Sequence, residues 1–553
     1  MRQGAHRFIT AIVRRLAAIL SSMAVTTAVL AVATDTPPAN AATSYQPGQF
    51  IAKTYTEALG RAPDQGGWGS AIATLTGNCT ADSLQAWGRG IFLSTEYTNL
   101  GYNNTQKALT AYRGILSRDP SQTELTNGAN QIASSGFSTF LNSLYDSSTF
   151  GSLAANDACA RDNYFYRADA IPPHAGGGLV AGDDIQSQID SAAPGSTVCI
   201  PQASLVYRST SAPLTVKSGI TLTTCGVTSR YQYAKMARII PNPYIGRAAL
   251  YNKPLVKVMP GATLQYLWVD GQRNQPINHV ADGDGDPTND HANSTAVYVE
   301  VAATQGSAST IQNNKIENSL GSQTVRIVNK DLLNGPCSGA TVSGNLVTGY
   351  SSYYLKGGFT GNAPWVDGIM SQCGSATATV SNNEIVDASD VALIALVYGG
   401  RNVDTDFTGN KVLQAGNNAF GGLVIDPFNI SGASFSGTTF SSNTLWSSAN
   451  NQFEIALSLG SRPWAFIINK VDGSGGAMTS NTTGTQRVRV RQFLSHNGEL
   501  GVTTSGNGGN IDFVGNFGSS TCLSVANVYN SAHASGSIQP GWTAHDNSNC
   551  IVG

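Results

Sequence analysis

The sequence has few charged residues, and several common signatures are missing from it. Only 12% of its 553 residues are Asp, Glu, Lys or Arg, while 60 are glycine. No Cys-x-x-Cys pair or His/Cys cluster is present, which argues against a structural zinc site. No P-loop, dinucleotide-binding fingerprint or nucleophile elbow occurs, and no apolar run beyond residue 41 is long enough to cross a bilayer. These absences favour a glycine-rich β-protein of the kind found outside cells.

The chain also lacks a series of Asn-Gly or Asp-Gly hairpins, which a β-sandwich of short strands needs. It repeats instead an Asn, one further residue and then an aliphatic residue, with β-branched strands about ten residues on. Such a period predicts coils that bury their faces only on one another, with Asn side chains stacked at a corner. We therefore expect an all-β right-handed parallel β-helix, a solenoid. The repeated Asn residues are Asn314, Asn345, Asn383, Asn410 and Asn443.

Residues 1–41 have the pattern of a signal peptide. Four arginines precede an apolar run from Leu16 to Ala33, and Ala39-Asn-Ala41 has the small-x-small form of a cleavage site. Removal of this segment leaves 28 basic and 33 acidic residues. We expect a secreted, extracellular protein with no membrane segment after signal removal and no nucleic-acid partner, because the remaining charge is negative.

Eight cysteines in an exported chain predict disulfides, although eight allow 105 pairings. Their spacing provides a hypothesis, because two pairs lie about one coil apart. These are Cys199 with Cys225 and Cys337 with Cys373; Cys79 with Cys159 and Cys522 with Cys550 would complete the set.

Residues 45–160 have apolar positions at helical spacing and predict an N-terminal α-helical domain with an internal repeat. Tyr55-x3-Leu59-x-Arg61-x-Pro63 recurs as Tyr112-x3-Leu116-x-Arg118-x-Pro120, and Ser94 to Tyr97 is echoed by Ser147 to Phe150. The unit resembles helical modules of unknown function in secreted and surface-layer-associated bacterial proteins. That resemblance implies cell-surface attachment or presentation; a cap over the open end of the solenoid is the alternative.

After a linker at 161–177, residues 184–201 read as a short amphipathic helix, a Pro-Gly turn and a strand. This opening resembles that of the pectate-lyase-like β-helix superfamily, and the resemblance extends over residues 178–530, with a C-terminal cap at 531–553. The superfamily contains polysaccharide lyases, glycoside hydrolases and epimerases, with some tailspikes and adhesins. A polysaccharide is therefore the expected partner.

Three aspartates within one expected coil form the first candidate site: Asp367, Asp387 and Asp390. Carboxylates stacked on neighbouring rungs repel, so one should keep a proton, and an acid beside a base suits glycosidic hydrolysis. The arrangement resembles that of polygalacturonase-type glycoside hydrolases, which implies that Asp390 is the general acid and that Asp367 and Asp387 activate water. Trp365-Val366 stands where that family has Asn-Thr, which argues against pectin as the substrate. Ordinary solvated bends are the alternative interpretation.

A second candidate is the acidic stretch Asp282-Gly-Asp-Gly-Asp-Pro-Thr-Asn-Asp-His291, in which alternating carboxylates resemble the start of a calcium loop. Asn293 occupies the place of the terminal Glu. The prediction is a Ca²⁺ site, and a flexible acidic insertion is the alternative. The expected ligands are Asp282, Asp284, Asp286 and Asp290, with His291 overhanging the substrate groove.

Basic and aromatic residues of the middle coils form the third candidate, because aromatic faces stack on sugars and a base beside calcium can abstract a proton. We expect a carbohydrate-active enzyme that hydrolyses a polysaccharide by carboxylate acid/base catalysis. A calcium-dependent polysaccharide lyase and a non-catalytic adhesin remain the alternatives. The expected substrate-binding residues are Arg326, Lys356, Trp365, Tyr398 and Arg401, together with His291.

Overall fold

The structure is a computed structural model. The residues it describes are 47–160, 172–245, 247–250, 253–272, 295–301, 308–319, 323–329, 339–349, 366–372, 378–388, 390–396, 403–416, 419–426, 433–434, 438–447, 453–459, 482–483, 485–493, 497–505 and 511–516. All belong to one compact unit, residues 45–553. The expected signal peptide and C-terminal cap lie outside the described residues. Among the helices described, none is long and apolar enough to cross a membrane.

The N-terminal region is helical, as the sequence predicts. Its elements are α2 (Gly48–Leu59), α3 (Gln65–Leu75), α4 (Ala81–Phe92), α5 (Thr95–Asn99), α6 (Asn104–Leu116), α7 (Gln122–Ser135), α8 (Phe137–Tyr145), α9 (Ser148–Leu153) and the π-helical turn η1 (Ala154–Ala158). Side-chain caps begin most of them, such as Ser121, which accepts from the backbone N–H of Glu124 on α7. Their apolar faces meet in one core around Phe50, Phe92 and Phe150.

The internal repeat of the helical region is visible as two sets of equivalent contacts. Arg61 lies 5.1 Å from the ring centre of Tyr55 and donates to Glu96, while Arg118 lies 5.4 Å from that of Tyr112 and donates to Glu124. Each Arg follows a helix that ends in a left-handed residue. The repeat thus encodes the cation–π contact twice, whereas the ion-pair partners Glu96 and Glu124 lie at different places relative to the two motifs.

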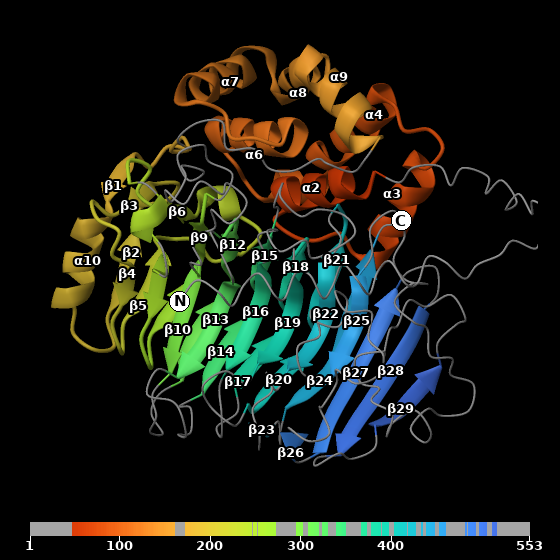
Figure 1. Cartoon of the computed structure of the whole chain (residues 1–553). Helices are drawn as coiled ribbons and strands as arrows, with labels where there is room; N and C mark the ends of the chain where they lie inside the picture. The colour runs from red at the N-terminus through yellow and green to blue at the C-terminus, as the bar shows by residue number, and fades with distance from the viewer. Residues whose placement is uncertain are drawn as a thin grey trace, which may run out of the picture. The chain divides into compact units, whose positions relative to one another are not determined.

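The remainder is built mainly from short parallel strands. After β1 (Leu179–Ala181) and α10 (Gly182–Ser191) the strands recur in threes, and they form three ladders in which each strand pairs with its equivalent one coil away (Figure 1). Ladder 1 contains β2 (Thr197–Ile200), β5 (Thr221–Thr224), β8 (Thr263–Gln265), β11 (Ser309–Gln312), β14 (Ala340–Ser343), β17 (Ala378–Ser381) and β20 (Thr405–Thr408).

Along the chain, each strand of ladder 2 after β1 follows a strand of ladder 1. It contains β1, β3 (Leu205–Tyr207), β6 (Ala237–Ile239), β9 (Leu267–Asp270), β12 (Lys315–Glu317), β15 (Leu346–Thr348), β18 (Glu384–Val386) and β21 (Lys411–Gln414); β24 (Thr439–Ser447) continues both ladders.

Ladder 3 completes each coil. It contains β4 (Leu214–Val216), β7 (Val256–Val258), β10 (Val297–Val301), β13 (Gln323–Asn329), β16 (Asp367–Gln372), β19 (Val391–Leu396), β22 (Ala419–Asp426) and β25 (Phe453–Leu459). Short 3₁₀ turns, η2 (Tyr233–Lys235) and η3 (Arg247–Leu250), lie between strands. This is the topology of a parallel β-helix behind a helical region, which confirms the predicted fold class at that level.

The far end departs from the parallel pattern. β23 (Ala433–Ser434) pairs with β26 (Thr482–Thr483), and β27 (Thr485–Phe493) is parallel to β24. β28 (Asn497–Ser505) and β29 (Ile511–Asn516) then pair antiparallel. The sequence does not predict this antiparallel ending within the expected 178–530 repeat.

The corner between ladders 1 and 2 explains the repeated Asn. Asn314, Asn345, Asn383, Asn410 and Asn443 form a buried amide ladder, with each Nδ2 2.9–3.0 Å from the Oδ1 of the next. The preceding residue is left-handed in four successive coils and alternates between Asn and Gly. A Cβ on Gly344 would lie 2.7 Å from Asn313 Oδ1, so an Asn in one coil needs a Gly in the next.

Inside the ladders, alternate residues form a continuous aliphatic core. The column Ile311, Val342, Val380 and Phe407 is in register over four coils and fully buried. Two disulfides are described, and both are predicted pairs: Cys199–Cys225 from the coil spacing, and Cys79–Cys159 as a pair that completes the set. Cys337, Cys373, Cys522 and Cys550 lie outside the described residues.

Candidate functional site

One corner of the coil, between ladder 2 and ladder 3, carries most of the predicted site residues. Asp387 follows β18, Asp390 precedes β19, and Asp367 begins β16 one coil earlier. In chain order, the acidic stretch with Asp282, Asp284, Asp286, Asp290 and His291 falls between β9 and β10, and Lys356 and Trp365 fall between β15 and β16. Those residues, and Tyr398 and Arg401 after β19, lie outside the described residues.

Asp367 is almost fully buried, with 4% of its surface exposed. It lies opposite Gln323 on β13 and on the same side of β16 as Ile369 and Ser371, which are interior. Its Oδ1 accepts from the backbone N–H of Val391 at 3.2 Å. The register of β16 with β19 pairs Ile369 with Leu393, so the rung beside Asp367 is Val391 and not Asp390. The two carboxylates are therefore offset by one residue, which differs from the direct stacking that the sequence predicts.

Asp390 is partly exposed and held at the corner by its backbone. Its N–H donates to Val366 O at 3.2 Å, and its carbonyl accepts from Gly421 N at 3.0 Å. These bonds tie it to the coils on both sides. Asp390 is thus the more exposed member of the pair, although its Oδ1 is itself buried.

Burial raises the pKa of Asp367 well above its ordinary value, and the nearby charge of Asp390 raises it further. Hydrogen bonds from Val391 and Gln323 oppose this effect without cancelling it. Both causes favour the protonated form of Asp367 over the ionised form. Desolvation is the larger of the two causes.

Asp387 has a different environment. It is fully buried with a left-handed backbone, φ 55°. Its Oδ1 accepts from Ala415 N at 2.7 Å and Gly416 N at 3.0 Å, and its Oδ2 accepts from Gln49 of α2 at 3.4 Å. These hydrogen bonds use both carboxylate oxygens of Asp387 to hold the corner of the coil and to anchor α2. The structure brings Asp367 and Asp390 together and directs Asp387 elsewhere.

Arg326 lies on the outer face of ladder 3, on the side opposite to the buried Val325 and Ile327. Its guanidinium is 6.0 Å from the ring centre of Tyr298 and donates to Gln372 Oε1 at 2.9 Å. Lys257, Tyr298, Arg326 and Met370 occupy successive rungs of this face. A basic and aromatic strip thus leads along ladder 3 to the strand that begins with Asp367.

Within the described parts of the chain, no group of three His, Cys, Asp or Glu residues is arranged to hold a metal ion. The predicted calcium ligands are not among those parts, so the calcium prediction stays a prediction.

A buried cluster of charged residues was not predicted from the sequence. It joins the helical region to ladder 2: Arg113 donates to Glu57 at 2.8 Å and Glu317 at 2.7 Å, and Lys315 donates to Glu57 at 2.8 Å. Arg238 pairs with Asp119 and Asp270. Nearly every member is excluded from solvent. The cluster therefore orients two parts of the protein and has no open face for a substrate.

Trp268 is at the centre of this cluster. The guanidinium of Arg238 lies 3.9 Å from its ring centre, that of Arg113 lies 4.7 Å away, and its Nε1 donates to Glu317 at 2.8 Å. A signal for the cluster exists in the sequence, because Lys315 and Glu317 alternate within one short strand of a chain that has few charges. The residues that pair with Lys315 and Glu317 come from distant segments, so nothing near this strand in the sequence indicates which residues they contact.

Comparisons with known proteins identify no family. No family model matches the chain, and no curated protein matches it significantly. Among solved structures, ORF18 of Geobacillus virus E2 aligns with 64% of this chain and 75% of that chain, at 10% identity and a TM-score of 0.22. That likeness is too distant to carry an argument.

Proposed function

We propose that this chain is a secreted carbohydrate-active enzyme that hydrolyses glycosidic bonds of a polysaccharide. In this proposal its ladders form a right-handed solenoid of the pectate-lyase-like kind, since parallel crossovers are right-handed in nearly all proteins. The observation that carries the proposal is the Asp367–Asp390 pair, in which burial raises the pKa of the Asp367 carboxyl beside the partly exposed Asp390. Secretion is supported by the two disulfides, which persist in oxidising compartments.

The pair supplies the proton that glycosidic cleavage requires. Asp390, the more exposed member, passes the shared proton to the glycosidic oxygen as the C–O bond breaks, and the departing sugar leaves as an alcohol. Water then adds to the oxocarbenium-like carbon, and the proton that this water releases restores the pair. Asp387 positions the corner and takes no part in proton transfer. Arg326 and Tyr298 contact the sugar on the outer face of ladder 3.

The test is a screen of the purified protein against plant, fungal and bacterial polysaccharides, with release of reducing ends as the measurement. We expect hydrolysis that survives EDTA and is lost in Asp390→Asn. The matched control is Asp404→Asn, because Asp404 is also a carboxyl whose pKa is raised by burial and then by a neighbouring aspartate, Asp406. The control should keep its activity.

Two outcomes would contradict hydrolysis. Products that absorb in the ultraviolet as unsaturated uronates, abolished by EDTA, would indicate the calcium-dependent lyase. Binding of a polysaccharide without any cleavage, equal in the Asp390→Asn variant, would indicate an adhesin.

A further inference from the structure

The outer face of ladder 1 carries a column of threonine side chains. Strand alternation directs residues such as Leu264 and Ile311 into the core, so the residues before them point outward. On six successive strands of ladder 1, from β2 to β17, that outward residue is a threonine, and the register places each beside the next. The column is Thr197, Thr221, Thr263, Thr310, Thr341 and Thr379. Every one of them is at least partly exposed, so the column belongs to the surface.

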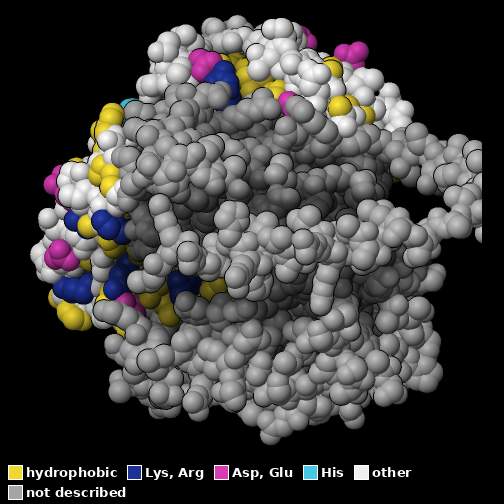
Figure 2. Space-filling view, viewed as in Figure 1, with side chains coloured by type: hydrophobic (Ala, Val, Ile, Leu, Met, Phe, Trp, Pro, Cys, Tyr) yellow, Lys and Arg dark blue, Asp and Glu magenta, His cyan; other side chains and the backbone are white. Residues whose placement is uncertain are grey.

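A second column lies beside the first, two residues further along each strand, and it is polar without charge. It includes Gln265, Gln312, Ser343 and Ser381, again in register. Neither column carries a charged side chain before Asp406 on β20. Ladder 3 differs, because Lys257 and Arg326 lie on its outer face, and Figure 2 shows Lys and Arg side chains over the first coils. The neutral face of ladder 1 is therefore complementary to an uncharged partner, and not to nucleic acid, an acidic polymer or a charged membrane.

The hydroxyl groups of the threonine column are not used inside the protein. None of the six side chains hydrogen-bonds to another residue that the structure describes. A buried hydroxyl nearby is paired, because Thr224 Oγ1 donates to Tyr266 O at 2.6 Å. Each outward hydroxyl can therefore donate to and accept from a partner outside. One such contact contributes little net free energy, since water offers the same bond, so binding through this face needs many contacts in register.

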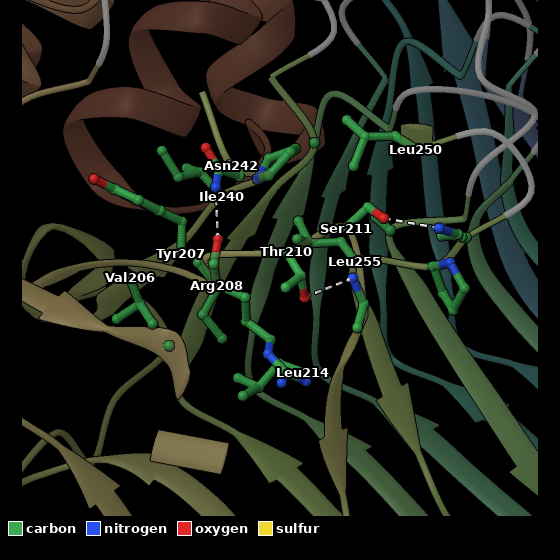
Figure 3. Close-up of a pocket in the computed structure, with 18 of the residues that line it drawn as sticks. Val206, Tyr207, Arg208, Thr210, Ser211, Leu214, Ile240, Asn242, Leu250 and Leu255 are labelled. Atoms are coloured by element: carbon green, nitrogen blue, oxygen red, sulfur yellow. Dashed lines mark hydrogen bonds between the residues drawn. The ribbon is translucent and has the colours of Figure 1, made fainter. Parts of the chain in front are cut away.

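The corner beside this face keeps it open and fixed. From β11 to β21, each strand of ladder 1 joins ladder 2 through two residues, a left-handed Asn or Gly and then an Asn of the amide ladder. A connection that short cannot fold over the threonines. Between ladders 2 and 3, in contrast, the connections after β3 and β6 are long enough to enclose a pocket lined by Leu214, Leu250 and Leu255 (Figure 3). The face of ladder 1 thus has its geometry before any partner arrives, which lowers the entropic cost of binding.

The spacing of the hydroxyls selects the kind of partner. Neighbouring coils lie about 4.8 Å apart and alternate residues of a strand about 6.7 Å apart, so the two columns form a two-dimensional lattice. A solid whose own groups repeat in two dimensions can meet such a lattice at every point. Water oxygens on the faces of an ice crystal repeat at spacings close to these, and water both donates to and accepts from a hydroxyl.

A crystalline polysaccharide also repeats in two dimensions, but its sugar rings present apolar faces that aromatic side chains cover best. Neither column has an aromatic side chain on these six strands. Each threonine instead adds a methyl group beside its hydroxyl, which is small enough to fit between the water molecules of a crystal face. The chemistry of the face therefore favours ice over a polymer crystal.

We propose that the outer face of ladder 1 is an ice-binding face. Its hydroxyls take the place of water molecules in the outermost layer of the crystal, and its methyl groups fill the gaps between them. The bound chain then blocks further growth of that layer. The inference goes beyond the proposed hydrolysis and does not rest on it, because Asp367 and Asp390 belong to ladder 3 and its corner with ladder 2.

Partition into growing ice tests the proposal on the full mature chain. A slowly grown ice shell is separated from the liquid, and protein is measured in both, beside serum albumin as a reference that does not bind ice. We expect the parent protein to be enriched in the ice over the reference, and to stop small crystals from coarsening in an annealed frozen solution. Thr310→Lys places a long charged side chain within the lattice and should lower the enrichment to that of the reference. Thr310→Ser keeps the hydroxyl and should retain most of it.

Thr126→Lys is the matched control, since Thr126 is an exposed threonine of α7 in the helical region. It adds the same charge away from ladder 1 and should leave the enrichment unchanged. Thermal unfolding of each variant shows whether a loss reflects misfolding. Thr263→Lys, one coil earlier, repeats the test at a second point of the face in case Thr310→Lys is destabilised.

Two results would overturn the proposal. The first is a parent protein that enters ice no more than the reference does, or an enrichment that both Lys variants on ladder 1 retain. The second is binding to crystalline cellulose or chitin that these variants lose, while ice leaves the protein in the liquid. Failure of the hydrolase is distinguishable, because Asp390→Asn should enter ice like the parent and Thr310→Lys should leave any polysaccharide cleavage unchanged.

Discussion

Arg113 of α6 and Glu317 of β12 form an ion pair at 2.7 Å, with both side chains excluded from solvent, although 204 residues separate them in the chain. The same guanidinium reaches Glu57 and Asp119. A helical attachment module, as the sequence suggests, would need no such link to the ladders. The cluster indicates that helices and ladders depend on each other for stability.

Replacement of Arg113 tests this dependence. Arg113→Met leaves three buried carboxylates without their shared cation, and breaking a buried pair costs about 3–5 kcal/mol. Arg61→Met removes a partly exposed pair with Glu96 and should cost about 0–1 kcal/mol. Urea unfolding of both variants measures the difference. Similar losses would show that the buried cluster is no more important than a surface pair.

Lys53 should make the free energy of unfolding depend on pH between neutral and alkaline values. Burial lowers the pKa of Lys53 to about 7, with Glu57 at 3.9 Å opposing the shift, while an unfolded lysine titrates near about 10.4. Between these values the unfolded chain binds the extra proton, so the free energy of unfolding rises with pH from about 7 to about 10. Lys53→Met should flatten this rise. Urea midpoints at several pH values in this range check it, and an unchanged slope in the variant would refute it.

Stability should be most sensitive to substitution of an Asn in the middle of the buried amide ladder. Asn383→Ala removes the acceptor for Asn345 N and Nδ2 and the donor to Val342 O and Asn410 Oδ1. Each buried group left unpaired costs about 1–3 kcal/mol, so we expect a total of at least about 3 kcal/mol. Asn127→Ala, at an exposed position of α7, is the control and should cost nothing measurable. Thermal unfolding compares the two.

The buried carboxyl of Asp367 should lower the free energy of unfolding of the protein. Its folded pKa lies above that of an unfolded aspartate, about 3.9, so the folded chain binds more protons between the two values and stability falls as pH rises through that interval. Asp367→Asn removes this term. The variant should be increasingly more stable than the parent from pH 4 to pH 7, and it should not hydrolyse polysaccharide. A constant difference in unfolding free energy over this range would contradict the raised pKa.

Local periodic features of the fold were predictable from the sequence. The Asn residues, the opening helix and strand at 184–201 and the doubled Tyr–Arg motif all repeat within a coil or a helix pair, and all appear where expected. The Cys199–Cys225 disulfide followed from the coil spacing, and Cys79–Cys159 followed as a pair that completes the set. The antiparallel pairing of β28 with β29 was not foreseen, because strand alternation is the same for both directions of pairing.

The candidate site was predictable only in part. Proximity of Asp367 to Asp390 followed from the repeat, but the one-residue offset and the separate role of Asp387 depend on register and on Gln49 of α2. Contacts between distant segments produce no periodic pattern in the sequence, so the charged cluster around Trp268 was not predicted.

The corner between ladders 2 and 3 accepts connections of very different length, from residues 387–390 to residues 271–296, while strand register on either side is kept. The regular ladders are thereby separated from connections whose length varies. Grafting a connection from one coil to another at this corner should alter which sugar is recognised and leave the folding of the ladders intact. Substrate specificity would then change one coil at a time, while the ladders stay the same.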